Sequence, residues 1–293
     1  LNYMAILSKR RKENVGGNFY VDSNCIDCET CMILAPEVFK EDGDASSVYA
    51  QPVDANSTRK ALQALVSCPT YSIGLEMALP ELKEIRESFP LLIEEDVYYN
   101  GYHSEKSFGA ASYFIKREKG NILVDSPRFA AGLAEKIKSL GGIKYIFLTH
   151  KDDIADQNKY AEYFGAQRIF HEADFNRHLS SAEIPIQGEE IISIDDDIKI
   201  IPVPGHTKGH CVLLYRDKFL FTGDHLAYSP TREHLHAFKN ACWYSWEKQI
   251  ESMKKLSKFQ FEWVLPGHGR KFNTDYATMK KQMELCINWM EKA

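Results

Sequence analysis

The chain has 293 residues, of which 44% are hydrophobic and 26% are charged. This composition is typical of a globular protein and excludes extensive disorder. The net charge of −5 argues against a nucleic-acid-binding protein, and no apolar stretch approaches the roughly 20 residues of a membrane-spanning helix. The length favours two domains.

The N-terminal residues do not resemble a targeting signal. Ala5–Leu7 is too short for the core of a signal peptide, and the basic run Lys9–Lys12 is interpreted as a solvated tail. Seven cysteines in a chain of this length do not form a disulfide framework. We therefore expect a protein of the cytoplasm or another reducing compartment.

Four cysteines have a spacing typical of iron–sulfur proteins. Cys25, Cys28 and Cys31 form C-x2-C-x2-C, and Cys68 follows immediately before Pro69. Three thiolates on one tight loop converge on a small volume, and a distant fourth closes the cage. The alternative is zinc, although structural zinc sites usually combine two separate C-x2-C pairs or cysteine with histidine. The spacing therefore favours an iron–sulfur cluster.

Residues 18 to 77 resemble a single-cluster bacterial ferredoxin. The resemblance rests on VDSNCIDCETCMILAPEVF and the later SCPTYSIG, and it implies a 4Fe–4S cluster bound by Cys25, Cys28, Cys31 and Cys68. Within this segment Ser57–Val66 has helical spacing, with Asn56 or Ser57 as a possible N-cap. Nine acidic residues against three basic ones suit an electron carrier with a positively charged protein partner, or simply a solvated surface.

We place a domain boundary near residue 79, with domains at residues 1–79 and 80–293. A short helix after Pro80 should stop at Pro90. Beyond it, periodicity predicts strands at Ser112–Lys116, Asn121–Val124, Lys144–Leu148, Arg168–Phe170, Ile191–Ile194, Ile198–Val203, Val212–Tyr215, Phe219–Phe221 and Trp263–Leu265. Helices are predicted at Ala130–Leu140, Ala155–Phe164, Trp246–Lys258 and Asp275–Lys292. The other cysteines, Cys211, Cys242 and Cys286, are expected to be buried free thiols.

Four of these strands lead into turns that carry histidine or aspartate. The turns read THKDDIAD after the strand that ends at Leu148, then PGHTKGH, TGDH and PGHG. Glycine beside a potential ligand lets the backbone turn sharply enough to point the side chain back at a centre. Each turn alone is weak evidence, because a histidine next to Pro-Gly is often simply exposed. The ordered set of four favours a metal site.

Residues 95 to 290 resemble the metallo-β-lactamase superfamily on these four turns. The resemblance implies an α+β protein in which the ferredoxin-like domain is followed by a four-layer αβ/βα sandwich. In the family the first motif is T-H-x-H-x-D-H, and the four turns bind two metal ions. Carried over by position, the implied ligands are His150, His206, Asp224 and His268.

The first motif departs from the family pattern. Asp152 stands where the second histidine would be, and the next two ligand positions fall on Ile154 and Ala155, which cannot bind a metal. A shift of two residues makes Asp156 the aspartate and Gln157 the weak replacement of the last histidine. We therefore predict Asp152 and Asp156 as further ligands, with Asp153 as the competing carboxylate. His150 and Asp156 are the predicted catalytic residues, and the second metal position is expected to be weakened.

The metal and the reaction follow less directly. The cofactors implied are the cluster and one or two ions of iron, zinc or manganese; carboxylates favour iron and manganese over zinc. The flavodiiron branch of the superfamily is similar in having a carboxylate in place of the second histidine. We expect a hydrolase-like or redox enzyme with a small-molecule substrate, or else a non-catalytic electron-transfer or binding protein with a degenerate metal site.

Other histidines and aromatic residues receive weaker interpretations. His210 and His225 flank the motifs and are expected to orient ligands. Aromatic residues between positions 225 and 246 line either a pocket or the core. Five histidines lie outside any motif and are expected at the surface or in the core: His103, His171, His178, His234 and His236.

Overall fold

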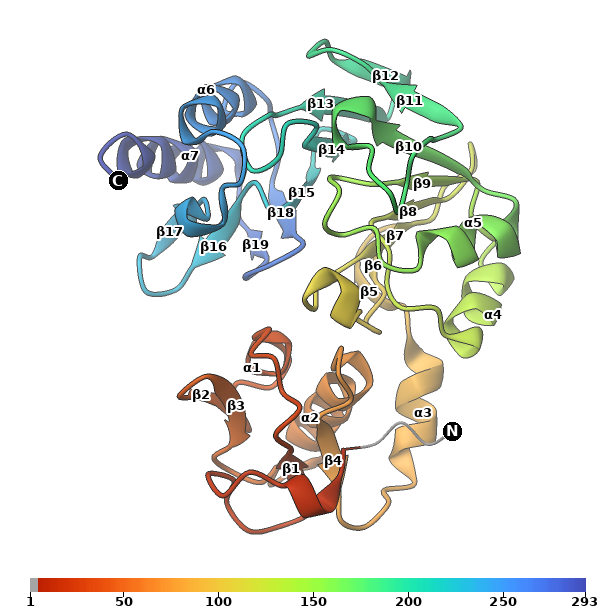
Figure 1. Cartoon of the computed structure of the whole chain (residues 1–293), viewed down its shortest axis with the longest axis vertical. Helices are drawn as coiled ribbons and strands as arrows, with labels where there is room; N and C mark the ends of the chain where they lie inside the picture. The colour runs from red at the N-terminus through yellow and green to blue at the C-terminus, as the bar shows by residue number, and fades with distance from the viewer. Residues whose placement is uncertain (1–4) are drawn as a thin grey trace. The chain divides into compact units, whose positions relative to one another are not determined.

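The computed structural model describes residues 5–293, which form two compact units (Figure 1). The first unit contains the residues up to Asn121, together with Pro127–Ile143 and Ala155–Phe164. The second contains Ile122–Ser126, Lys144–Ile154 and Gly165–Ala293. No helix in the described part of the chain has the length and apolar character needed to cross a bilayer.

The first unit begins with small antiparallel ladders and two helices. β1 (Phe19–Val21) pairs with β4 (Ile73–Leu75), and β2 (Phe39–Asp42) pairs with β3 (Ala45–Val48). A 3-10 turn, η1, lies at Leu7–Lys9. The short helix α1 (Thr30–Leu34) carries Cys31 and contacts α2 (Ala55–Ser67), which ends next to Cys68.

Helix α2 is longer than predicted. Its N-cap is Asp54, whose carboxylate accepts from the backbone N–H of Ser57 at 2.7 Å, while the Ser57 hydroxyl accepts from the backbone N–H of Asp54. This capping box typically stabilises a helix by about 1 kcal/mol. The predicted cap at Asn56 or Ser57 is therefore wrong by two or three residues.

The remainder of the first unit contains α3 (Glu81–Ser88), an antiparallel ladder and two further helices. The ladder joins β5 (Leu91–Glu94), β6 (Val97–Tyr99) and β7 (Tyr113–Ile115), with the 3-10 turn η2 (Glu105–Ser107) between β6 and β7. Helix α4 (Ala131–Ser139) is followed by Gly141 and Gly142, both with positive φ, as expected for a helix end. Helix α5 spans Gln157–Phe164.

The second unit holds two ladders that carry the predicted turns. The first is parallel and joins β8 (Ile122–Val124), β9 (Tyr145–Phe147), β10 (Gln167–His171) and β11 (Ile184–Ile186). The second has the order β12 (Ile192–Asp195), β13 (Ile198–Pro202), β14 (Cys211–Tyr215), β15 (Phe219–Gly223), β18 (Trp263–Pro266) and β19 (Phe272–Asn273). A hairpin joins β16 (Ala227–Ser229) to β17 (His234–His236). The 3-10 turns η3 (Glu172–Asp174) and η4 (Lys239–Ala241) lie in the connecting loops.

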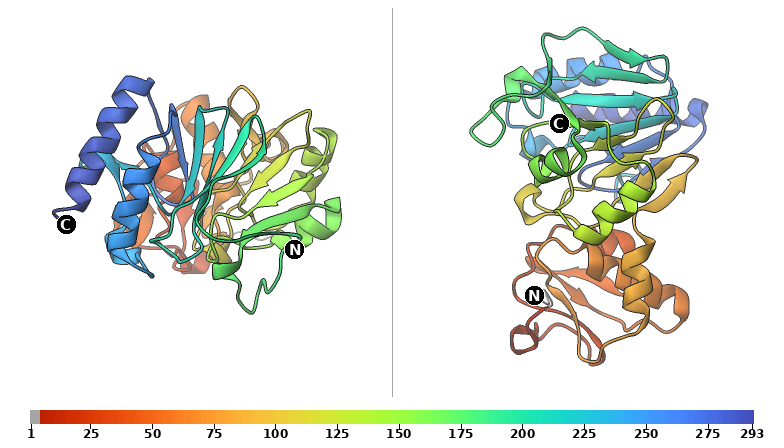
Figure 2. Two further views of the ribbon diagram at one scale, coloured as in Figure 1. Left: turned by 90° about the horizontal axis from the view of Figure 1, so that it is seen from above. Right: turned by 90° about the vertical axis from the view of Figure 1, so that its right-hand side faces the viewer.

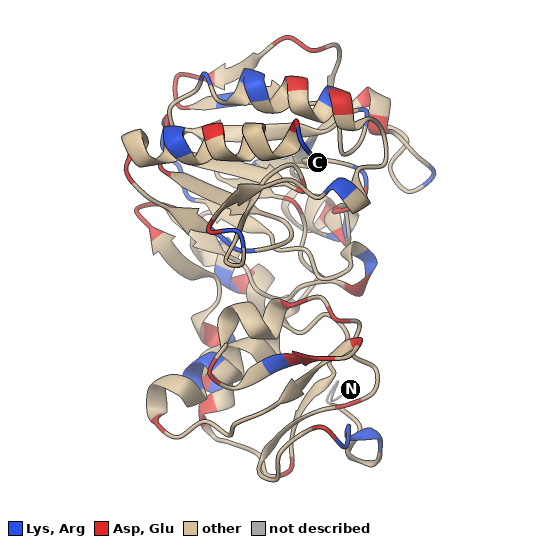
Figure 3. Cartoon of the chain, turned by 90° about the vertical axis from the view of Figure 1, so that its left-hand side faces the viewer, with Lys and Arg blue, Asp and Glu red and all other residues tan. Residues whose placement is uncertain are grey.

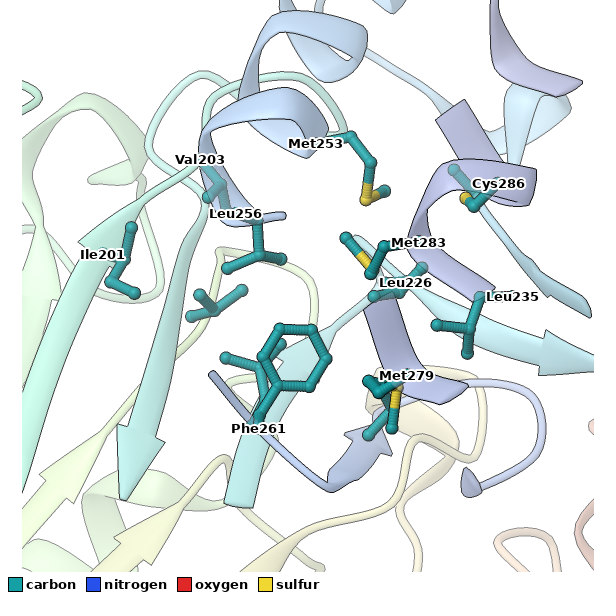
Figure 4. Close-up of a cluster of buried hydrophobic side chains, with 14 of the residues drawn as sticks. Ile201, Val203, Leu226, Leu235, Met253, Leu256, Phe261, Met279, Met283 and Cys286 are labelled. Carbon is teal, nitrogen blue, oxygen red and sulfur yellow. The ribbon is translucent and has the colours of Figure 1, made fainter. Parts of the chain in front are cut away.

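Helices α6 (Trp246–Leu256) and α7 (Tyr276–Met290) lie side by side on the outer face of the second sheet (Figure 2). Their inner faces pack on strand residues in a cluster rich in methionine and leucine, including Met253, Leu256 and Met283 (Figure 4). Full burial of one such side chain contributes about 1.5–3 kcal/mol. The solvent-facing sides carry lysine and glutamate (Figure 3), and Lys254 forms an ion pair with Glu291 at 2.5 Å.

The three remaining cysteines differ in burial. Cys211 in β14 and Cys286 in α7 are both 0% exposed, as predicted for buried thiols. Cys242 is only half-buried, so the prediction is wrong at this position. It follows η4 in a loop, where its Sγ donates to the backbone carbonyl of Gly205 at 3.2 Å.

Candidate metal centre and cluster site

Four ligand-bearing turns meet in the second unit. β9 is followed by His150, the loop after β13 carries His206, and β15 ends beside Asp224. β18 pairs in parallel with β15 (Figure 1), and the turn after it places His268 next to Asp224. Rigid strands thus deliver each side chain to one location.

The spacing of the donor atoms suits metal ligation better than hydrogen bonding. Oδ2 of Asp224 lies 3.7 Å from Nε2 of His150, 3.7 Å from Nε2 of His206 and 3.9 Å from Nε2 of His268. Oδ2 of Asp152 lies 3.8 and 3.6 Å from the same atoms of His150 and His206. Ligands about 2.0–2.2 Å from a shared ion are separated from one another by distances of this size.

Asp153 adds a third carboxylate. It is 1% exposed, and its ligand atom clusters with those of His150 and Asp224. A Cβ atom at Gly267 would lie 2.5 Å from Oδ2 of Asp153 and 3.0 Å from Oδ1 of Asp224, so glycine is what lets the two carboxylates approach this turn. Burial and the charge of Asp224 raise the pKa of Asp153 well above its ordinary value. A bound cation would remove that repulsion.

Several donor atoms of this cluster have no hydrogen-bond partner within residues 5–293. They are Nε2 of His150, both ring nitrogens of His206, Oδ2 of Asp153 and Oδ1 of Asp224, all buried. Buried polar atoms are almost always paired, so their convergence fits a metal site. Burial lowers the pKa of His150 to about 4, which leaves its imidazole neutral at pH 7, the form that binds metals.

A second set of residues orients His150. Its Nδ1 lies 3.0 Å from Oγ1 of Thr149, which donates to the carboxylate of Asp125 at 3.0 and 3.1 Å. Nδ1–H therefore donates to Thr149 and turns Nε2 toward the other ligands. Burial raises the pKa of Asp125 to about 8. Sequence reasoning missed Asp125, although its place directly after strand β8 was a possible signal.

His210 and Asp174 hold the neighbouring loops. The ring of His210 stacks on His150 at 4.9 Å, and its Nε2 accepts from the backbone N–H of Asp224 at 3.3 Å, which agrees with the predicted orienting role. Asp174 accepts from Oγ1 of Thr207 at 2.5 Å and from the backbone N–H of Gly209 at 2.8 Å. It thereby fixes the loop of His206. No motif surrounds Asp174, and sequence reasoning missed it. His225 is buried as well.

The structure does not bring Asp156 into this cluster. Its carboxylate lies 2.6 Å from Nζ of Lys106 and accepts from the backbone N–H of Phe129 at 2.9 Å. Among the described residues, Asp156 belongs to no cluster of side chains that could hold a metal ion. The backbone turns away after Asp153, with Ala155 at a positive φ of 31°. The carboxylate that lies in the cluster is thus that of Asp153 rather than that of Asp156. Gln157 begins helix α5 and is likewise not in the cluster.

Exposed aromatic residues lie beside His206. Trp243 is 65% and Tyr244 is 49% exposed, and both donate a backbone N–H to the carbonyl of His206. The Trp243 ring lies 6.3 Å from that of His206. A cavity of about 470 Å³ adjoins the same loop and is lined by Lys208, Tyr244 and Lys248 among others. Of the aromatic residues between positions 225 and 246, Tyr244 lines this cavity, whereas Tyr228 and Trp246 pack against the hydrophobic cluster. Phe238 is half-buried beside Gly269.

The four cysteines of the ferredoxin motif line one small cavity in the first unit. Two of the sulfurs accept backbone hydrogen bonds: Cys25 accepts from the N–H of Ser46 at 3.4 Å, and Cys68 accepts from the N–H of Ser72 at 3.2 Å. Burial raises the pKa of the Cys28 thiol to about 11, a cost that coordination to iron would offset because the ligand is the thiolate. Four free thiols facing one cavity fit the cluster that the spacing predicts.

Comparison with known proteins confirms both family resemblances that the sequence predicted. Residues 21–75 match the family model described as the 4Fe–4S single cluster domain of Ferredoxin I, and residues 92–285 match that of the metallo-β-lactamase superfamily. Ferredoxin-1 of Desulfocurvibacter africanus is 36% identical over 59 residues, which are 20% of this chain and 91% of that protein.

The second half has more distant relatives. The hydroxyacylglutathione hydrolase of Acidiphilium cryptum is 34% identical over 120 residues, 39% of this chain and 48% of the relative, so the match spans about half of its length. The metallo-β-lactamase from Hirschia baltica has the same fold, with a TM-score of 0.51 and 17% identity over 67% of this chain and 96% of that one. The chain is thus an α+β member of the metallo-β-lactamase superfamily, with a 4Fe–4S single-cluster ferredoxin domain preceding the αβ/βα sandwich.

Proposed function

We propose that this protein is a redox enzyme in which the ferredoxin domain supplies electrons to a binuclear iron centre in the metallo-β-lactamase domain. The observation that carries the proposal is the equal number of histidines and carboxylates in the donor cluster. Asp152 replaces a histidine of the family motif, and Asp153 adds a further oxygen ligand. Oxygen-rich sites of this kind favour iron or manganese, whereas zinc favours nitrogen and sulfur.

We divide the donor atoms into two positions that share Asp224. Its Oδ2 lies between the three histidines, and its Oδ1 lies on the side of Gly267 and Asp153. We assign His150, Asp152, His206 and Asp224 to the first position, and Asp153, Asp224 and His268 to the second. Asp153 thus takes the role that the sequence predicted for Asp156.

A pair of iron ions held here would supply one-electron redox chemistry and an open position for a small molecule. The residues of the chain do the rest. Asp152, with 45% of its side chain exposed, lies on the open side of the cluster, while His150 is 0% exposed. Trp243 stands beside His206 at the surface and can limit what reaches the centre. The hydrogen bond through Thr149 to Asp125 keeps His150 in one orientation.

The fused ferredoxin domain is a second reason to favour redox chemistry over hydrolysis. A hydrolase needs no electron source, because metal-bound water is the nucleophile. We place the boundary between the two domains near residue 79, between the two matched ranges, and we expect an electron-transfer protein to reduce the cluster. A reducing compartment would keep the cysteines available for iron.

The experiment follows the cluster by its visible absorption. Anaerobic protein is reduced with one electron per cluster and mixed with hydrogen peroxide or dioxygen, and the return of the oxidised spectrum is timed. The His206→Ala variant should lose the binuclear metal but keep the cluster, since the two sets of ligands are distinct. We expect slow reoxidation in this variant and fast reoxidation in the natural protein. Equal rates would rule out electron flow through the metal centre.

A second candidate function is the hydrolysis of a thioester or related bond. The similarity to hydroxyacylglutathione hydrolases favours it. Zinc-loaded protein that cleaves acyl thioesters, with activity lost in the His206→Ala variant, would support hydrolysis. In that case the oxidant assay should show no dependence on His206.

A further inference from the structure

The cysteine cage of the ferredoxin domain is completed by residues that lie within the sequence range of the metallo-β-lactamase family. His103, Gly109 and Arg128 belong to that range, and all three lie in the first unit together with the four cysteines. Gly109 packs so tightly that a Cβ on it would lie 2.7 Å from Cβ of Cys28 and 3.0 Å from its sulfur. A free-standing ferredoxin would lack these neighbours.

A chain of hydrogen bonds leads from this segment to the sulfur of Cys28. Oγ1 of Thr30 lies 3.3 Å from Sγ of Cys28 and 2.9 Å from Nδ1 of His103, whose Nε2 lies 2.6 Å from the hydroxyl of Tyr99. A cysteine bound to iron is a thiolate and can only accept. Thr30 therefore donates to the sulfur and accepts from Nδ1–H of His103, and Nε2 of a neutral His103 then accepts from the hydroxyl of Tyr99.

Arg128 places a permanent positive charge beside another cysteine. Its guanidinium donates to the carbonyls of Cys68 at 3.0 Å, His103 at 2.5 Å and Val66 at 2.6 Å. It also lies 4.4 Å from the centroid of the Tyr71 ring. Because arginine is not deprotonated in proteins, this partly buried cation stays charged.

We propose that His103 and Arg128 raise the reduction potential of the cluster, so that the metallo-β-lactamase part of the chain determines when the ferredoxin domain accepts its electron. The inference rests on a cluster bound by the four cysteines but not on the identity of the second metal. Reduction adds one electron from a low-potential donor and changes no covalent bond. The added negative charge is stabilised by a hydrogen bond to a sulfur and by a nearby cation, and both favour the reduced state.

The test is a potentiometric titration of the full-length protein, monitored by the electron paramagnetic resonance of the reduced cluster. Thr30→Val keeps the shape of the side chain and removes the donor to the sulfur. His103→Leu removes the next donor, while His103→Asn retains an N–H near the position of Nδ1. Arg128→Gln removes the partly buried cation next to Cys68, and Arg59→Gln is the control, because Arg59 is an exposed cation of the same domain.

We expect Thr30→Val, His103→Leu and Arg128→Gln to shift the midpoint potential to more negative values. His103→Asn should restore most of the natural value, and Arg59→Gln should leave it unchanged. If His103→Leu loses the cluster, Thr30→Val decides the role of the hydrogen-bond chain. If Arg128→Gln loses it, Arg128→Met, which keeps the unbranched stem without the charge, decides the role of the cation. The proposal would be overturned if Thr30→Val had the same midpoint potential as the natural protein, or if Arg59→Gln and Arg128→Gln shifted the midpoint potential equally. A colourless natural protein would instead refute the cluster itself.

Discussion

Replacing Asp153 by asparagine separates metal binding from folding more cleanly than any other change at the centre. Asp153 is 1% exposed, and its Oδ2 has no hydrogen-bond partner among the described residues. Without metal, burial and the neighbouring Asp224 oppose its charge and raise its pKa well above the ordinary value. A neutral amide of the same shape should therefore leave the metal-free protein as stable as before, or slightly more stable.

The metal-bound protein should respond in the opposite direction. Mutating a residue that only hydrogen-bonds to a metal ligand typically lowers metal affinity by about 10–100-fold. Because Asp153 is itself assigned as a ligand, losing its carboxylate should weaken metal binding by at least about 100-fold. At a fixed excess of metal this removes about 2.7 kcal/mol of stabilisation. For a domain of this size the increase in Tm on adding metal should shrink by roughly 5–10 °C.

The assay is calorimetric unfolding with and without added iron(II) under anaerobic conditions. Asp156→Asn is the matched control, because Asp156 binds Lys106 and the backbone N–H of Phe129 instead of the metal cluster. Asp156→Asn should lower Tm by the same amount with and without iron(II), so the increase in Tm on adding metal should stay unchanged. An unchanged increment in Asp153→Asn, or an equal loss in Asp156→Asn, would refute the assignment of the second metal position.

Three further predictions follow from the same structure. Gly267→Ala should push apart the carboxylates beside it and reduce metal content to about half, whereas Gly132→Ala, where an added Cβ meets nothing within 4 Å, should leave metal content unchanged by elemental analysis. Cys28→Ser should abolish or sharply weaken the visible absorption without changing the metal of the second domain. The Arg168 hydrogen bond lowers the pKa of Glu183 to about 2, so this pair stabilises the fold above pH ~4.5 and loses its effect as the pH falls toward 2. Because the Glu183 side chain is 40% exposed, Glu183→Gln should cost only about 1 kcal/mol in urea unfolding at pH 7, and the difference should vanish near pH 2.

Local sequence patterns identified most of the donor cluster. His206, Asp224 and His268 each follow a strand and sit beside glycine, and the resemblance to the metallo-β-lactamase superfamily implied that they are ligands of one centre. His150 and Asp152 follow the apolar run of β9 in the same way. Strand and helix bounds agreed to within a few residues where periodicity was strong; α7, for example, begins after Asp275, whose carboxylate caps it.

The choice between Asp153 and Asp156 was beyond such patterns. It depends on the positive φ of Ala155 and on Lys106, which binds Asp156 from 50 positions earlier in the chain. Short strands such as β5 and β6 were missed because they lack a long alternating pattern.

Supporting residues were the hardest to predict. Asp174 acts through backbone atoms of a loop far away in sequence, and no motif marks such a contact. His103 was expected to be an ordinary surface or core histidine, yet it bonds to Thr30 beside the cysteine cage. Both roles arise from tertiary packing, which brings together segments that share no local signal.

The most direct test of the account is the metal and sulfide content of protein purified without oxygen. A 4Fe–4S cluster together with an iron pair predicts about six iron and about four sulfide per chain, with little zinc. Mössbauer spectroscopy should then separate the cluster iron from a high-spin pair that disappears in the His206→Ala variant. About four iron with two zinc per chain would contradict the redox proposal and favour hydrolysis. No metal beyond the cluster would contradict the binuclear centre itself.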